Sequence, residues 1–391
     1  MIQNSLHKKR ISKVKLKYIL MFLLGLIQGC VESYEPNISK YESLMVVDAI
    51  LTNQAGSAHV TLSKTYPYNE DVDTYIDDAL VKLIDENGLE YTFLNEKRGS
   101  YILADSLFEA RVGEKYKIYI ETPDGTVCES AYEAITQPVA IDSVYYEFVD
   151  SDDDKLKGLQ ILMDVKNNEN RSQYFAWEYI ETWEFEVPYI SSYVPNSQVC
   201  YRTARSTVFL IQSTKEYSQG SLSKYPIYFI DNTTNRLYIK YSVLVSQYSL
   251  TESTYTFLKD LKEINEEQGT LFDKAPMTLI GNLINLNDPN IPVLGNFQAS
   301  AVSTKRLTLR NRDFTFRLDP PSGFEDCMAK YLSTELEQGQ LDSFLRTNWS
   351  VIDTIIYAQP VDTLVGISNS VFCYDCKVSG TVIKPDYWDE E

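Results

Sequence analysis

The chain has 391 residues, of which 44% are hydrophobic and 13% are aromatic, and it carries a formal charge of −19 at pH 7. This acidic balance argues against a nucleic-acid-binding protein and against a basic patch for anionic lipid headgroups, because both need clustered lysine and arginine. The length predicts two or more domains, and the 29 tyrosines favour strands.

The first 29 residues are predicted to be a lipoprotein signal peptide. Residues 1–17 hold six lysines and arginines and no acid, and residues 18–27 form an apolar run, YILMFLLGLI. The run is shorter than the roughly 20 apolar residues that a membrane-spanning helix needs. It leads into IQGC, which resembles the lipobox of bacterial lipoproteins and predicts that Cys30 is lipidated, with acyl chains such as palmitate. An ordinary signal peptide with an incidental cysteine, or an amphipathic helix, is the alternative.

Cleavage before Cys30 would remove the six positive charges and leave a mature chain of charge −25. Residues 30–41 are polar and lack periodicity, so they are predicted to be a lipidated tether. The acyl chains would then hold the protein in a membrane. Glu32 and Glu35 resemble an acidic surface-export signal, which favours the cell surface, and a periplasm-facing protein remains the alternative.

Residues 42–137 are predicted to form a β-sandwich domain of the immunoglobulin-like or transthyretin-like kind. Several segments alternate apolar and polar residues, as KYKIYIE does at residues 115–121. The sequences ENG at residues 86–88 and TPDG at residues 122–125 are turn signals between such segments. About seven short strands with turns every ~8–12 residues are typical of a sandwich.

Residues 138–391 are predicted to form a larger β-rich, sandwich-like domain with a few helices. Long strands are expected at residues 174–187 and 236–248, and residues 188–225 are expected to be a long, partly irregular excursion. A clear helix near residues 250–268 has apolar residues at helical spacing, with a capping box in SLTE at residues 249–252 and a stop at Gly269. Further expectations are short helices around residues 327–332 and 341–345, and strands at residues 371–374 and 380–383.

The six cysteines are interpreted through the exported location, which permits disulfides. If Cys30 is lipidated, five remain, so at least one is unpaired. Cys128 lies in a strand pattern and is predicted to be the free, buried thiol. The disulfide candidates are Cys200, Cys327, Cys373 and Cys376, and their connectivity stays open. The C-x-x-C at residues 373–376 is followed by β-forming residues and Gly380 rather than by a helix, which disfavours a redox centre, and a four-cysteine zinc site would need a second such pair.

No catalytic residues, metal ligands or cofactor are predicted. His59 is the one histidine after the signal peptide, and it lies in an alternating segment without a G-x-S-x-G motif, so we interpret it as a strand residue. Asp150, Asp152 and Asp154 match the start of a calcium loop, but Lys155 and Ile161 stand where its glycine and glutamate belong. A pair of carboxylates for glycoside hydrolysis cannot be picked out among 55 acids.

Two further features are interpreted as structural. Trp177 and Trp183 are six residues apart and would share one face of a strand, where core packing is favoured over a sugar-stacking platform. Residues 281–300 contain asparagines and a glycine suited to turns with positive φ or local side-chain hydrogen bonds, which we prefer to a ligand site. They are Asn282, Asn285, Asn287 and Gly295.

An ordered set of segments resembles a known family. After Cys30 come LMVVDAILTN, DDALVKLIDENGLEY, VGEKYKIYIETPDG, YSVLVSQYSLTESTYTFLKDLKEINEEQGTLFD, LIGNLINLNDPNIPVLGNFQASAV and CYDCKVSGTVIKPDYW. Together they resemble the Bacteroidetes lipoprotein family catalogued as domain of unknown function 4249, over nearly all of residues 30–388. The resemblance implies an outer-membrane lipoprotein, often encoded beside TonB-dependent receptors. It implies no activity and no catalytic residues.

The resulting expectation is a non-enzymatic outer-membrane lipoprotein that is an accessory or ligand-capture partner of a TonB-dependent transporter, a β-barrel receptor. The ligand is unknown. A surface hydrolase of glycans or peptides is the first alternative, and a structural or adhesive envelope protein is the second.

Overall fold

The computed structural model describes residues 43–66, 74–151, 156–166, 172–207, 210–217, 220–267, 279–319, 323–334, 337–347, 349–358 and 361–389. Cys30, the signal peptide and the tether lie outside these residues. The described chain is built mostly from strands, and the predicted mainly β fold class is confirmed.

The first part of the described chain forms the predicted sandwich. Its strands alternate buried and exposed residues, so that each strand turns one face to a shared core. Gly88, with φ +84°, makes the turn between two of them. The strands are β1 (Met45–Thr52), β2 (His59–Lys64), β3 (Leu80–Asp85), β4 (Glu90–Lys97), β5 (Ser100–Leu103), β6 (Lys115–Glu121), β7 (Val127–Ser130) and β8 (Glu133–Ala134).

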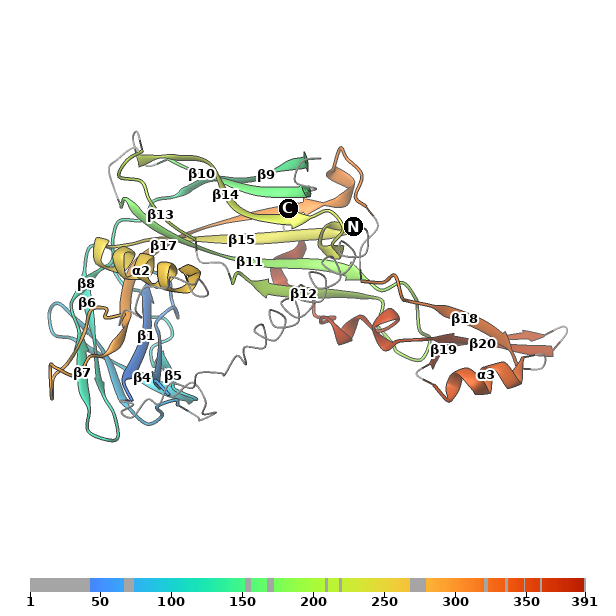
Figure 1. The fold of residues 1–391 in the computed structure, drawn as a ribbon, viewed down its shortest axis with the longest axis horizontal. Helices are drawn as coiled ribbons and strands as arrows, with labels where there is room; N and C mark the ends of the chain where they lie inside the picture. The colour runs from blue at the N-terminus through green and yellow to red at the C-terminus, as the bar shows by residue number, and fades with distance from the viewer. Residues whose placement is uncertain are drawn as a thin grey trace, which may run out of the picture. The chain divides into compact units, whose positions relative to one another are not determined.

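The second part adds long strands and a second layer. Strands β11 (Tyr174–Glu186) and β15 (Lys240–Ser249) pair antiparallel. A separate three-stranded sheet consists of β14 (Leu222–Asp231), β10 (Leu156–Val165) and β9 (Ile141–Ser151), in that order. Side chains from both layers form one core, and Figure 1 shows β9, β10 and β14 running along β15 and β11. This packing is sandwich-like, as predicted.

Strand β17 (Leu294–Arg310) connects the two cores. Its first half pairs parallel with β1, and its second half pairs antiparallel with β15 (Figure 1). Just before it, β16 (Leu283–Asn285) pairs with β7. Leu283, Val293 and Phe297 consequently belong to the core of the first sandwich. The predicted division at residue 137 does not include this return of the chain, because a local pattern carries no information on a partner about 160 residues away.

One sheet results from these pairings in the described chain. Its strand order is β12-β11-β15-β17-β1-β2-β5-β4-β3-β6-β7-β16, with β13 beside β11 and β8 beside β6. Strands β12 (Val199–Arg205) and β13 (Leu210–Ser213) lie in the segment expected to be partly irregular, where no strand had been located from the sequence. Both are short and half exposed, which weakens the alternating pattern that would reveal them.

Helix α2 (Glu252–Glu267) is the helix predicted near residues 250–268. The Thr251 hydroxyl accepts a hydrogen bond from the Thr254 N–H and so caps the first turn. Ser249, the predicted cap, instead lies in β15, and Gly269 is outside the described residues. Tyr255 and Leu258 pack on Tyr174 and Ile211. Within the part of the chain that the structure describes, no helix is long and apolar enough to cross a membrane.

The C-terminal part contains a small third sheet with its own core. Its order is β18 (Ala329–Ser333), β20 (Val361–Ser368) and β19 (Ser350–Ala358), and α3 (Gln338–Leu345) packs against it. The helix expected around residues 341–345 is present. The prediction of a helix around residues 327–332 is wrong, because Ala329 to Ser333 form strand β18 and pair with β20.

The strands expected near the end of the chain are also wrong. Three 3₁₀ turns occupy this region, namely η4 (Val371–Cys373), η5 (Cys376–Val378) and η6 (Asp386–Asp389). Thr381 makes an isolated bridge with Tyr201. Cys373 and Cys376 are three residues apart and form disulfides with different parts of the fold. This constraint favours tight turns over an extended chain. Two further 3₁₀ turns are present: η2 (Asn235–Leu237) precedes β15, and η3 (Asn311–Asp313) follows β17.

Candidate functional site

The four cysteines predicted to pair form two disulfides, Cys200–Cys376 and Cys327–Cys373. The first joins β12 to the turn η5, and the second joins the segment before β18 to the turn η4. The two cysteines of the C-x-x-C sequence therefore have different partners. The C-x-x-C motif thus attaches the C-terminal tail to the fold through two disulfides, and its two sulfurs do not form a dithiol centre.

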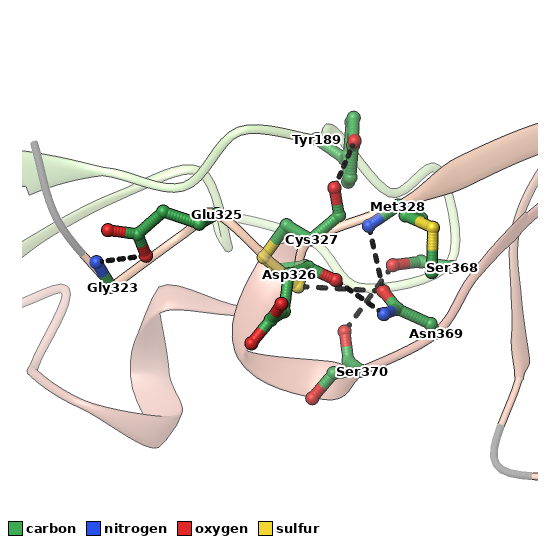
Figure 2. Close-up of a disulfide and its surroundings, with 10 residues drawn as sticks. Tyr189, Gly323, Glu325, Asp326, Cys327, Met328, Ser368, Asn369 and Ser370 are labelled. Atoms are coloured by element: carbon green, nitrogen blue, oxygen red, sulfur yellow. Dashed lines mark hydrogen bonds between the residues drawn. A yellow bond between two sulfur atoms is a disulfide. The ribbon is translucent and has the colours of Figure 1, made fainter. Parts of the chain in front are cut away.

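Hydrogen bonds hold the chain on both sides of the Cys327–Cys373 bridge (Figure 2). The Asn369 side chain accepts from the Met328 N–H at 2.9 Å and donates to the Asp326 carbonyl at 2.6 Å. The Tyr189 hydroxyl donates to the Cys327 carbonyl at 3.0 Å. The Tyr189 bond ties the segment before β18 to the loop after β11, and the Asn369 bonds hold that segment to the end of β20.

Cys128 is a free, fully buried cysteine, as predicted. It lies in the first core beside Met45, and burial raises the pKa of its thiol to about 12. A thiol with so high a pKa is not a nucleophile at neutral pH.

The other singled-out side chains are structural. His59 lies on β2 with its Nε2 3.2 Å from the Ser100 hydroxyl, a cross-strand contact. Trp177 and Trp183 are buried in the second core, which confirms core packing for both. Asp152 and Asp154 lie outside the described residues. Among the residues that the structure describes, no group of three histidines, cysteines or carboxylates is placed to hold a metal ion.

The predicted turn residues around β16 make local side-chain hydrogen bonds or adopt a positive φ, as expected from the sequence. The Asn282 amide accepts from the Phe297 N–H and donates to the Phe297 carbonyl, at 2.9 and 2.8 Å. Asn285 and Asn287 accept main-chain N–H bonds from the loop and from Val127. Gly295 has φ +97° where β17 meets β1. Gly295 itself lines a pocket, and Asn282 holds the strand β17 that forms part of the pocket wall.

This pocket, here called the helix pocket, lies between α2 and the strands β1, β11, β15 and β17, and its volume is about 550 Å³. The parallel register places Asp48 opposite Asn296 and Ile50 opposite Gln298 on one face of the sheet. Most of the wall is apolar. Its apolar residues include Val46, Trp177, Leu210, Phe257, Leu258, Leu261 and Leu294.

A few polar groups converge on this apolar wall. Asn296 is 8% exposed and lies in the pocket wall. Asp48 is exposed on β1, but the surrounding chain partly desolvates its carboxyl and raises its pKa, an effect that the nearby His59 opposes. The Tyr248 hydroxyl donates to Glu178 at 3.2 Å, and burial raises the pKa of Tyr248, so it remains a donor. An apolar cavity with a few oriented polar groups is the usual form of a small-molecule site.

Sequence reasoning missed the helix pocket. The segments that form it are LMVVDAIL, which was interpreted as a strand, and GNFQAS, which was interpreted as architectural. One signal was available: Asn296, Gln298 and Ser300 alternate with apolar residues. Alternation shows that they share a face of a strand. It does not show that α2 covers that face.

Comparison with known proteins gives one family match. The family described as "Domain of unknown function (DUF4249)" matches residues 31–306. No curated protein matches the chain. Among solved structures, a chain titled "Biofilm associated protein - BSP domain" is similar at 9% sequence identity, over 72% of this chain and 63% of that chain, with a TM-score of 0.16. The match thus spans less than two thirds of that chain, and at this TM-score it carries no argument about fold or function.

Proposed function

The chain belongs to the family described as domain of unknown function (DUF4249), and from this premise we propose a non-enzymatic, ligand-capturing lipoprotein of the outer membrane. Cys30 would carry the lipid anchor, and residues 30–41 would connect the anchor to the folded part. The partner would be a TonB-dependent β-barrel receptor, which the protein supplies with ligand or covers.

The observation that carries ligand capture is the helix pocket. Its volume of about 550 Å³ falls within the ~300–1,000 Å³ of typical small-molecule sites. Its apolar wall suits an uncharged, largely apolar body, and the buried Asn296 amide suits a hydrogen-bonding group on that body. The membrane anchor and the transporter partner rest on the N-terminal sequence and on the family resemblance.

The pocket is tested by what copurifies with the protein. The full chain and the variant Leu261→Arg would be purified from the native membrane, extracted with organic solvent and compared by mass spectrometry. We expect a compound enriched with the wild type and lost in Leu261→Arg, because Leu261 lines the pocket. The matched control is Ile264→Arg, on the same helix but outside the pocket wall, which should retain the compound. Equal loss in both variants would count against the pocket.

The partner is tested separately, by mild crosslinking in intact cells at native expression followed by pull-down. We expect a TonB-dependent β-barrel to be recovered with the wild type. Cys30→Ala, which cannot be lipidated, should leave the membrane fraction and lose the barrel. Recovery of the wild type without any barrel would refute the transporter role and leave ligand capture standing.

A surface hydrolase is the second candidate, favoured by one observation. Asp48 and Glu178 both line the helix pocket, and the raised pKa of Asp48 is the property that a general acid needs. Hydrolase activity is tested by incubating the protein with glycans and peptides and assaying for new reducing ends or amines. Activity that disappears in Asp48→Asn would establish a hydrolase and replace the non-enzymatic proposal.

A further inference from the structure

A second pocket lies at the other end of β15, where the C-terminal tail returns to the large sheet. We call it the tail pocket, and its volume is about 850 Å³. Tyr201 of β12 bonds through its main chain to Thr381 and so holds the tail beside the sheet. The disulfide Cys200–Cys376 anchors the start of the tail next to this contact. Trp388, 2% exposed, closes one wall.

Positive side chains outnumber negative ones in the lining of the tail pocket. Lys240, Arg310, Arg312 and Lys384 all line it, although the whole chain has a charge of −19. The lining also holds two carboxylates, and both are engaged. Glu184 accepts the Trp388 indole N–H at 3.0 Å, and Asp389 pairs with Lys384. Within the described chain, neither acid of the pocket wall forms an ion pair with Lys240, Arg310 or Arg312, although both attract Lys240 from a greater distance.

Lys240 and Arg310 form the least compensated part of the tail pocket. The strand register places them directly opposite each other on β15 and β17, where like charges repel. Lys240 is only 8% exposed. Its ammonium donates to the Trp388 carbonyl and lies 5.0 Å from the centre of the Trp388 ring, and no carboxylate of the described chain is within ion-pair distance. Desolvation and the charge of Arg310 lower the pKa of Lys240, and the charges of Asp389 and Glu184 partly oppose this effect.

We propose that the tail pocket binds the carboxylate or phosphate group of a small anionic ligand through Lys240, Arg310 and Arg312. An oxyanion between Lys240 and Arg310 would replace their mutual repulsion by two attractions. An arginine offers paired N–H donors that match a carboxylate or phosphate, and the desolvated lysine adds a point charge. Arg312 is mostly exposed, with only a loose 3.7 Å contact to Asp313, so it can turn toward the anion.

The experiment is calorimetric titration of the full chain with two probes, citrate and inorganic phosphate, at constant ionic strength set with sodium chloride. We expect saturable binding at one site for at least one probe. The probe that binds more tightly identifies the ligand group as carboxylate or phosphate. Arg310→Gln should weaken binding at least about tenfold, the loss expected for one charge-assisted hydrogen bond.

The matched control is Lys305→Gln, which removes a charge from the same strand but outside the tail pocket and should bind as the wild type does. Thermal unfolding without anion separates binding from folding. Arg310→Gln should unfold at or above the wild-type temperature, because it relieves the repulsion with Lys240. The proposal is overturned if neither probe binds, if both variants weaken binding equally, or if Arg310→Gln lowers the unfolding temperature while binding is unchanged.

Discussion

Gly295 illustrates how one residue decides a long-range pairing. Its φ is +97°, and an added Cβ would overlap the Val47 carbonyl oxygen of the neighbouring strand. The parallel contact of β17 with β1 therefore requires glycine for two separate reasons, a backbone angle and a close approach. Because this contact also shapes the helix pocket, the residue links stability to the candidate site.

We predict that Gly295→Ala lowers the free energy of unfolding by about 2–4 kcal/mol. The control is Gly88→Ala, which has φ +84° but no atom within 4 Å of the added Cβ, so it measures the cost of the backbone angle alone. Its expected loss is about 1 kcal/mol. Urea unfolding of both variants gives the comparison, and equal losses would mean that the overlap with Val47 is relieved without cost.

Cys128 gives a prediction about reactivity and pH. The native protein should bind no thiol reagent at pH 8, because burial holds the pKa of Cys128 at about 12. An ordinary cysteine has a pKa of about 9. The folded state therefore keeps its proton where the unfolded state loses it, so the contribution of Cys128 to stability is fully present below pH 9. That contribution should decrease as the pH rises from 9 towards 12.

Counting thiols after unfolding without a reductant also tests Cys30. One reactive thiol per chain is expected if Cys30 is lipidated, since the other four cysteines are in disulfides. Two reactive thiols would show that Cys30 is unmodified. Mass spectrometry of the labelled peptides identifies which cysteine has reacted.

At the scale of elements, the two disulfides hold different parts of the chain. Cys200–Cys376 attaches the C-terminal tail to β12, and Cys327–Cys373 attaches the small third sheet to η4. The small sheet has a limited core of its own, with Leu332, Leu341 and Ile367 at its centre. Cross-links stabilise such parts chiefly by restricting the unfolded chain.

We predict that serine replacement of either disulfide lowers the free energy of unfolding by about 2–4 kcal/mol. The local effects should differ. Loss of Cys200–Cys376 should speed hydrogen exchange in residues 380–389 and weaken anion binding in the tail pocket. Loss of Cys327–Cys373 should speed exchange in β18 and β20 and leave the tail pocket unchanged. The same exchange pattern in both variants would show that the tail and the small sheet open together.

At the scale of the whole molecule, residues 279–303 complete a sandwich that begins about 230 residues earlier. β16 pairs with β7, β17 pairs with β1, and the Val302 N–H donates to Asn53 at 2.7 Å. Phe297, Ala299 and Ala301 are buried in the first core. Residues from the second part of the chain therefore complete the sheet and the core of the first part, although each part has its own core.

We predict that residues 43–137 alone do not fold stably. The fragment would expose the edge of β1 and lack core side chains such as Leu283 and Phe297, losing several kcal/mol of burial at ~1.5–3 kcal/mol per large apolar side chain. Urea unfolding followed by circular dichroism should show no cooperative transition for the fragment, and addition of residues 279–303 should restore one. A cooperative transition for the fragment alone would mean that the first sandwich is autonomous.

The sequence alone determined the features that local chemistry encodes. Alternation identified the strands of the first sandwich and the mainly β class, because side chains of a strand point to opposite faces with a period of two. Helical spacing located α2, and burial within a strand pattern pointed to Cys128 as the free thiol. The family resemblance followed from the order of the segments, and the family match supports it.

Only the tertiary structure decided which segments meet. The parallel pairing of β1 with β17, the disulfide connectivity and the composition of both pockets each join residues more than 40 positions apart. Lys240 and Arg310 are unremarkable in the sequence and become a candidate anion site because two strands place them face to face. Local patterns fix which face of an element is apolar, whereas the partner that covers that face is chosen by the packing of the whole chain.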